Sequence, residues 1–150
     1  MSDFRQLSDA VWASPQIDLD DVAAAAARGF AMIINNRPEG ESLDQAGGDA
    51  IAEAAHAAGM AYRAIPVTHA GFNEDQVEQM AEALDSATGP VLAYCRSGTR
   101  STLLWSLAKA SQGAAPGDLA AAAASAGYDL SPIAPALHHY SAQAQAQPKG

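Results

Sequence analysis

The sequence contains a single cysteine, few basic residues and no long hydrophobic run. One cysteine among 150 residues excludes an internal disulfide and is typical of a reducing compartment. Only 8 Lys and Arg residues stand against 17 Asp and Glu, and this net charge of −9 argues against a nucleic-acid partner or an anionic membrane. The lack of a membrane-spanning run and of a basic, apolar signal segment at the N-terminus predicts a soluble, cytoplasmic protein.

Turn residues divide the rest of the sequence into alternating candidate strands and helices. Strands are expected within 4–13, 30–35, 61–67 and 90–95, and helices over 18–27, 49–58, 73–84, 101–113, 116–126 and 132–140. This alternation predicts an α/β fold with a mainly parallel central sheet flanked by helices. The length suits one domain, residues 1–140, and the Gln/Ala-rich segment 141–150 is expected to be a flexible tail.

Two of the expected helices carry further signals. Asn73 and Gln76 have the spacing of a capping box at the start of one helix. Its apolar residues share one face: Val77, Met80, Ala81 and Leu84. In the helix expected from Ser101, one stripe has core spacing, formed by Leu103, Leu104, Leu107 and Ala108. Trp105 lies off that stripe.

The segment 94–101, Tyr-Cys-Arg-Ser-Gly-Thr-Arg-Ser, joins the last strand to the next helix and is the candidate active site. Backbone N–H groups in such a turn favour an anion, and they favour the thiolate of Cys95 over the thiol. Arg100 is placed to hold two oxygens of an oxyanion in a fork. The remaining anion-binding residues are expected to be Arg96, Ser97, Gly98 and Thr99, with Gly98 adopting a backbone conformation that other residues resist. The alternative is a buried structural cysteine, but these polar neighbours make a poor apolar core.

Ligands of parallel sheets bind beyond the carboxyl ends of the strands, so the loops 37–41, 68–72 and 95–101 are expected to converge there. Arg37 in the first loop either helps to recruit an anion or pairs with Glu39 or Glu41 in a solvated turn. The four histidines, His56, His69, His138 and His139, show no metal-ligand spacing, and no glycine-rich nucleotide motif is present. We therefore expect neither a metal nor a cofactor.

These motifs resemble the phosphatase-like domain of the beta-lactamase-hydrolase-like family, which is related to dual-specificity protein phosphatases. The resemblance runs from Leu7 to about Leu137 and includes the segments 14–16, 33–38, 65–67, 93–101 and 126–131. It implies a protein-tyrosine-phosphatase-like fold, a Cys95 thiolate that attacks phosphorus, and a Ser101 hydroxyl that stabilises this thiolate as it leaves. Because family members are fused or adjacent to metallo-hydrolase-type domains, it also implies such a partner enzyme.

The resemblance places a general acid on the loop 68–72, where the usual aspartate is absent. His69 is the best substitute, since the unperturbed pKa of histidine, about 6.5, allows proton donation near neutrality. Asp75, one helical turn further on, is the reserve candidate. Both have ordinary alternatives: an exposed loop histidine without a role, and an acid of a first helical turn.

Two features of the Cys loop depart from the phosphatase pattern. Four residues separate Cys95 from Arg100, where phosphatases have five, and Tyr94 stands where phosphatases usually have histidine. Both features resemble rhodanese sulfurtransferases, in which Cys95 would carry a persulfide. A hydrolase would take a small anionic substrate and a sulfurtransferase a sulfur donor and acceptor, while an anion-binding module with little turnover is the third hypothesis. The phosphatase-like hydrolase is favoured because the expected fold and the position of the acid loop agree with it.

Overall fold

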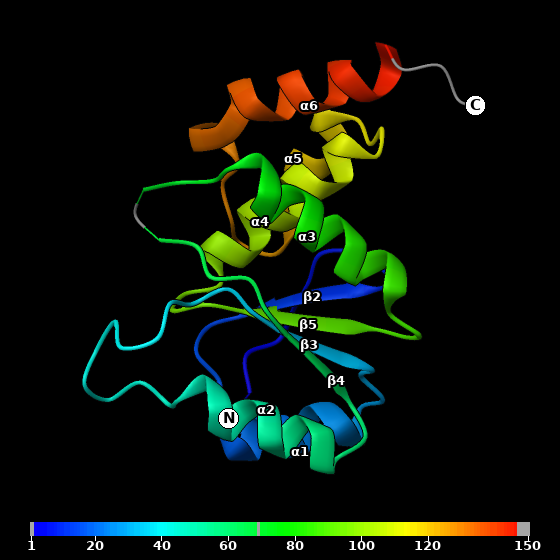
Figure 1. Cartoon of the computed structure of the whole chain (residues 1–150). Coiled ribbons are helices and arrows are strands. Elements are labelled where there is room, and N and C mark those ends of the chain that lie inside the picture. The colour runs from blue at the N-terminus through cyan, green and yellow to red at the C-terminus, as the bar shows by residue number, and fades with distance from the viewer. Residues whose placement is uncertain (1, 69, 147–150) are drawn as a thin grey trace.

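The computed structural model describes residues 2–68 and 70–146, whose strands form one five-stranded sheet (Figure 1). The strands lie in the order β1 (Arg5–Gln6), β2 (Val11–Ser14), β5 (Val91–Tyr94), β3 (Met32–Asn35) and β4 (Ala61–Ala64). The pair β1–β2 is antiparallel, and the pairs β2–β5, β5–β3 and β3–β4 are parallel. The predicted α/β fold with a mainly parallel sheet is therefore confirmed.

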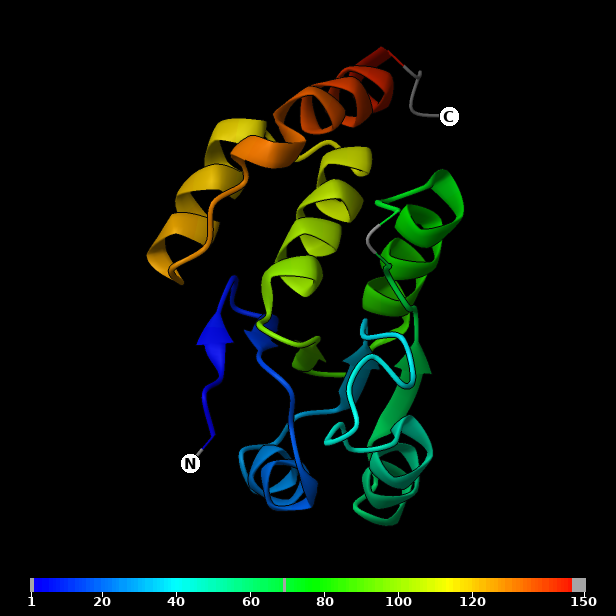
Figure 2. The same ribbon diagram turned by 90° about the vertical axis from the view of Figure 1, so that its left-hand side faces the viewer.

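Helices cover both faces of this sheet (Figures 1 and 2). One face carries α1 (Leu19–Ala27) and α2 (Gly48–Ala57), and the other carries α3 (Glu74–Ser86) and α4 (Thr99–Ser111). Beyond α4 lie α5 (Pro116–Ser125), the 3-10 turn η1 (Ser131–Ile133) and α6 (Ala134–Ala146). No helix within the described ranges is long and apolar enough to cross a membrane.

The core consists of two hydrophobic clusters, because successive side chains of a strand point to opposite faces of the sheet. Ile33 and Leu92 belong to the cluster that contains the buried residues of α1 and α2. Ile34 and Ala93 belong to the cluster that contains the buried residues of α3 and α4. Since β3 and β5 are covered on both faces, every residue of these two strands is buried.

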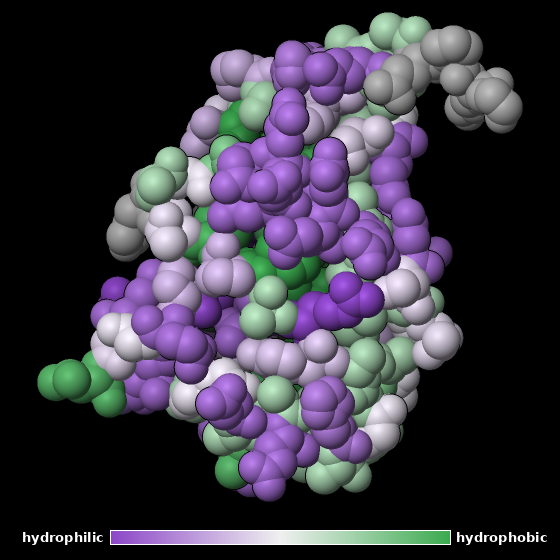
Figure 3. All heavy atoms as spheres, in the orientation of Figure 1, coloured by the Kyte–Doolittle hydropathy of each residue, from purple (hydrophilic) through white to green (hydrophobic). Residues whose placement is uncertain are grey.

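The N-terminus of α3 is capped as predicted. The Asn73 side chain accepts a hydrogen bond from the Gln76 N–H at 2.8 Å, and the Gln76 side chain accepts one from the Asn73 N–H at 2.9 Å. Val77 and Met80 of the predicted apolar face are buried. The outer face of α3 is covered by polar side chains (Figure 3), with exposed acids at Glu74, Asp75, Glu78, Glu82 and Asp85.

Helix α4 differs from the prediction in its start and in its burial. It begins at Thr99 rather than Ser101, so the Cys loop is shorter than expected. Trp105, which lies off the predicted core stripe, is itself buried. Because α4 packs against the sheet and against α3, α5 and α6, all residues from 101 to 108 are buried. A single apolar stripe cannot describe a helix that is covered on all sides.

The predicted helix end at residue 140 is wrong, because α6 continues to Ala146. Ser141 is buried, and its hydroxyl donates to the Ala114 carbonyl at 3.3 Å. Alanine and glutamine have high helix propensity, so a segment with few residues to bury still prolongs the helix. Residues 147–150 of the predicted tail lie outside the described residues.

Candidate active site

Cys95 follows the central strand β5, at the point where the chain turns towards α4. Its side chain is buried, and Sγ accepts a hydrogen bond from the Gly98 N–H at 3.1 Å. Gly98 has a φ of +92°, in the left-handed region that glycine adopts without strain, as its place in the sequence predicted. The loop thus directs a backbone amide at the sulfur, where it stabilises a negative charge.

The other residues of the Cys loop face solvent. Arg96, Ser97 and Thr99 are exposed. The Ser97 hydroxyl donates to Thr99 Oγ1 at 2.9 Å and accepts from the Thr99 N–H at 3.3 Å. The Arg96 carbonyl accepts a hydrogen bond from the Gln16 N–H at 3.2 Å, which ties the loop to the segment after β2.

The Arg100 guanidinium joins the Cys loop to the two neighbouring loops. Its Nη1 and Nη2 donate to the two carboxylate oxygens of Glu41 at 2.7 and 2.8 Å, and Nη1 also donates to the Val67 carbonyl at 2.8 Å. The loops after β3, β4 and β5 therefore meet at the carboxyl end of the sheet, as predicted. In Figure 1 they lie at the left-hand end of the sheet, and in Figure 2 this end faces the viewer.

Both Nη atoms of the Arg100 guanidinium donate hydrogen bonds within the protein. The hydrogen bonds that Arg100 donates to Glu41 raise the pKa of Arg100 above its ordinary value, and the nearby Cys95 sulfur adds to the shift. Its Nε makes no hydrogen bond within the described part of the chain. This N–H is therefore available for an oxygen of a bound anion.

Arg37 is buried, with 4% of its surface exposed, so the predicted solvated turn is wrong. Of the expected partners it pairs with Glu41, at 2.9 Å from Nε. Its Nη atoms donate to Gln16 Oε1 at 3.0 Å and to the Ser42 hydroxyl at 3.1 Å. Arg37 thus anchors the loop after β3 to the segment after β2. Glu39, the other expected partner, instead accepts a hydrogen bond from the Gly48 N–H at 2.7 Å.

Glu41 is the central charged residue that sequence reasoning did not place in the site. The hydrogen bonds from Arg100, and then those from Arg37, lower the pKa of Glu41 to about 2, against the opposing effect of burial. The carboxylate is therefore charged at neutral pH. The sequence signalled only its pairing with Arg37, four residues earlier, because the contact with Arg100 spans 59 residues.

Ser101 and Asp75, expected to stabilise the leaving thiolate and to donate a proton, differ in their burial. Ser101 is fully buried in the first turn of α4, and its hydroxyl has no hydrogen-bond partner among the residues described. Asp75 is exposed in the first turn of α3. His69 lies outside the described residues. Ser101 therefore lies buried in the helix that follows the Cys loop, and Asp75 lies at the surface.

Tyr94 belongs to the core. It is 1% exposed and packs in the cluster on the α1 and α2 face, where burial raises its pKa. Its hydroxyl has no hydrogen-bond partner in the described ranges. Core packing therefore accounts for an aromatic residue before Cys95. Tyr94 does not distinguish a phosphatase from a sulfurtransferase.

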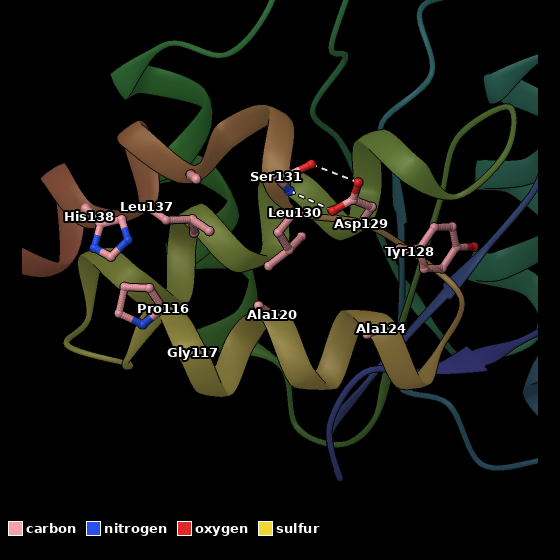
Figure 4. A pocket seen from close by; sticks show the side chains of 11 residues that line it. Pro116, Gly117, Ala120, Ala124, Tyr128, Asp129, Leu130, Ser131, Leu137 and His138 are labelled. Atoms are coloured by element: carbon pink, nitrogen blue, oxygen red, sulfur yellow. Dashed lines mark hydrogen bonds between the residues drawn. The ribbon is translucent and has the colours of Figure 1, made fainter.

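A groove of about 670 Å³ lies between α5 and α6 and contains none of the predicted site residues (Figure 4). Its lining is mostly small or aliphatic, with Gly117, Ala120, Ala124, Leu130 and Leu137. The Asp129 carboxylate at its rim accepts hydrogen bonds from the Ser131 N–H and hydroxyl, at 2.9 and 2.8 Å.

Over the described residues, no three His, Cys, Asp or Glu side chains are grouped to hold a metal ion. The Cys loop therefore remains the candidate active site.

Residues 3–112 match the family model of the beta-lactamase hydrolase-like protein, phosphatase-like domain. The chain belongs to this family. The match ends before α5, whereas the resemblance seen in the sequence extends to about Leu137. A beta-lactamase hydrolase-like protein of Xylella fastidiosa is 38% identical over 100 residues, which cover 67% of this chain and 23% of that protein. The match thus spans less than a quarter of the relative's length.

Solved structures with a similar fold include proteins named as phosphatases. A "putative phosphatase" of Neisseria meningitidis Z2491 is 31% identical, with a TM-score of 0.80 over 91% of this chain and 96% of that chain. Kinase associated phosphatase, crystallised with serine in place of its catalytic site cysteine, has a TM-score of 0.74 at 14% identity, over 99% of this chain and 97% of that one. At that identity the likeness concerns the fold alone, and it confirms the predicted tyrosine-phosphatase-like fold.

Proposed function

We propose that this phosphatase-like domain is a cysteine-dependent hydrolase that acts on a small phosphorylated substrate through a Cys95 thiolate. The observation that carries the proposal is the buried Cys95 sulfur, which accepts the Gly98 N–H at 3.1 Å beside the Arg100 guanidinium. A backbone amide and a cation together stabilise a thiolate, which is the nucleophilic form of cysteine. The family and the fold of its structural neighbours support the same assignment.

In the proposed reaction the Cys95 thiolate attacks phosphorus, and the bond from phosphorus to the leaving oxygen breaks. Water then attacks the cysteinyl-phosphate, which releases inorganic phosphate and restores the thiolate. The Nε edge of Arg100, which makes no hydrogen bond to the described residues, is proposed to hold oxygens of the transferred group. Ser101, whose buried hydroxyl has no partner among the described residues, donates a hydrogen bond to the departing sulfur.

His69 is proposed to protonate the leaving oxygen. It lies two residues after Val67, whose carbonyl accepts a hydrogen bond from Arg100, so the loop that carries His69 is tied to the Cys loop. The exposed Arg96 is proposed to attract anionic substrates at the mouth of the site. Arg37 is proposed to have no role in substrate binding, because its buried guanidinium donates hydrogen bonds to protein side chains.

Sulfur transfer is the second candidate, and the length of the Cys loop favours it. With four residues between Cys95 and Arg100, the loop has one amide fewer than the phosphatase signature. In this reaction the thiolate attacks the outer sulfur of thiosulfate, the S–S bond breaks, and sulfite leaves. Cyanide then takes the outer sulfur of the persulfide as thiocyanate and restores the thiolate.

Two assays on the same proteins separate these candidates. The wild type is expected to hydrolyse p-nitrophenyl phosphate, and Cys95→Ser is expected to release no phosphate. Arg100→Ala should lose about 2–4 kcal/mol of transition-state stabilisation, or roughly 30-fold to 1,000-fold in rate. Arg63→Ala, on the edge strand β4, is the matched control and should behave as wild type.

Each other outcome has a distinct meaning. Phosphate release that survives in Cys95→Ser would rule out the thiolate mechanism. Thiocyanate formation from thiosulfate and cyanide, without phosphate release, would establish the second candidate. Binding of phosphate without turnover in either assay would indicate an anion-binding module.

A further inference from the structure

The peptide bond between Ser97 and Gly98 is held from both sides. On the inner side, the Gly98 N–H donates to Cys95 Sγ at 3.1 Å. On the outer side, the Ser97 carbonyl accepts a hydrogen bond from the Tyr128 hydroxyl, also at 3.1 Å. The C=O and N–H of a trans peptide point in opposite directions, so a contact that fixes one also fixes the other.

Gly98 makes the close approach of Tyr128 possible. A Cβ atom at position 98 would collide with the Tyr128 hydroxyl and would lie 2.9 Å from Cζ of the same ring. The absence of a side chain at Gly98 therefore serves two purposes. It permits the left-handed backbone conformation, and it leaves room for the tyrosine that reaches the Ser97 carbonyl.

Tyr128 is itself fixed by contacts outside the Cys loop. It is 8% exposed, and the Arg5 guanidinium lies over its ring at 5.2 Å from the centroid. Figure 4 shows the ring at one end of the α5–α6 groove, with the hydroxyl directed away from the other lining residues. Burial raises the pKa of Tyr128, so its hydroxyl is protonated at neutral pH and donates the hydrogen bond to Ser97.

We propose that Tyr128 is a positioning residue for the Cys95 thiolate. By holding the Ser97 carbonyl, its hydroxyl turns the Gly98 N–H towards the sulfur and so stabilises the negative charge there. Tyr128 acts through the Ser97–Gly98 peptide and does not contact the substrate. The role concerns ionisation of the thiol and holds for either reaction, while its effect on phosphate release rests on the proposed function.

The charged groups around Cys95 and Tyr128 come from three other parts of the chain. Arg100 from α4 lies beside Cys95, and Glu41 from the loop after β3 faces the sulfur through Arg100. Arg5 from β1 stacks on Tyr128 and pairs with Asp3 at 3.1 Å. Removing the Tyr128 hydroxyl keeps all four of these charged side chains. A change in the ionisation of the Cys95 thiol would therefore report on the Gly98 N–H that faces it.

Tyr128→Phe removes the hydroxyl and keeps the ring. The rate of Cys95 alkylation by iodoacetamide, measured against pH, is expected to have its midpoint about 0.5 to 1 pH unit higher than in wild type. Below both midpoints, alkylation should be about threefold to tenfold slower. Under the proposed function, kcat for p-nitrophenyl phosphate falls by a similar factor and KM changes little. Tyr140→Phe on α6 is the matched control and should leave both measurements unchanged.

An unchanged alkylation midpoint in a natively folded Tyr128→Phe protein, checked by circular dichroism, would overturn the proposal. A raised midpoint in a protein without phosphatase activity would retain the positioning role and reject the proposed function. Gly98→Ala provides an independent test because it displaces the Tyr128 ring. Its effect and that of Tyr128→Phe should be strongly non-additive in the double variant, and simple additivity would contradict the coupling.

Discussion

At the scale of single residues, one carboxylate organises the candidate site. Glu41 binds Arg100 through both of its oxygens and also accepts a hydrogen bond from the buried Arg37. Each charge in this network has an opposite partner at hydrogen-bond distance, which offsets the cost of removing it from water. Because both Nη atoms of Arg100 donate to Glu41, this carboxylate fixes the orientation of the guanidinium beside Cys95.

Replacing Glu41 by glutamine tests this positioning. A carboxamide has one acceptor oxygen, and its NH₂ group repels the second guanidinium N–H, so Arg100 loses its fixed orientation. We expect phosphate release by Glu41→Gln to fall by about tenfold or more, mostly in kcat. Glu39→Gln is the matched control, since its remaining oxygen still accepts from the Gly48 N–H. Equal rates for Glu41→Gln and wild type would exclude the positioning role.

At the scale of helices and strands, local signals predicted most elements and failed where distant segments decide the outcome. The cap at Asn73 and the left-handed Gly98 depend on neighbouring residues, and both were predictable. The burial of Trp105 depends on three further helices packed around α4, which no local pattern records. Likewise, the Cys loop was recognisable in the sequence, whereas the contacts of Glu41 and Tyr128 with it cross 59 and 31 residues.

The capping box of α3 has a measurable contribution to stability. Asn73→Ala removes the side-chain acceptor for the Gln76 N–H and leaves that donor to water. The free energy of unfolding, measured by urea denaturation, is expected to decrease by about 1 kcal/mol. Asn73→Asp keeps an acceptor at the same position and should stay within about 0.5 kcal/mol of wild type. A loss of equal size in both variants would show that the cap is not the cause.

At the scale of the whole molecule, Glu41 makes folding stability depend on pH. Its pKa is about 2 in the folded protein against an ordinary value of 4.5, so the ionised carboxylate favours the folded state. This contribution is complete above about pH 4.5 and is lost as the pH falls through about 2. Between pH 5 and pH 2, wild type should therefore lose more stability than Glu41→Gln. Urea denaturation across this range measures the difference, and parallel curves for the two proteins would contradict it.

The hydrogen bonds around Cys95 can form only after distant segments of the chain have come together during folding. Gln16 and Tyr128 contact the Cys95 loop, and Glu41 and Val67 contact Arg100 at its end, from segments that span most of the chain. A polypeptide still emerging from the ribosome has made Cys95 before it has made Tyr128, and it carries an ordinary thiol at that stage. If Cys95 is the proposed thiolate, its activation requires tertiary assembly, and unfinished or misfolded chains would carry only an ordinary thiol.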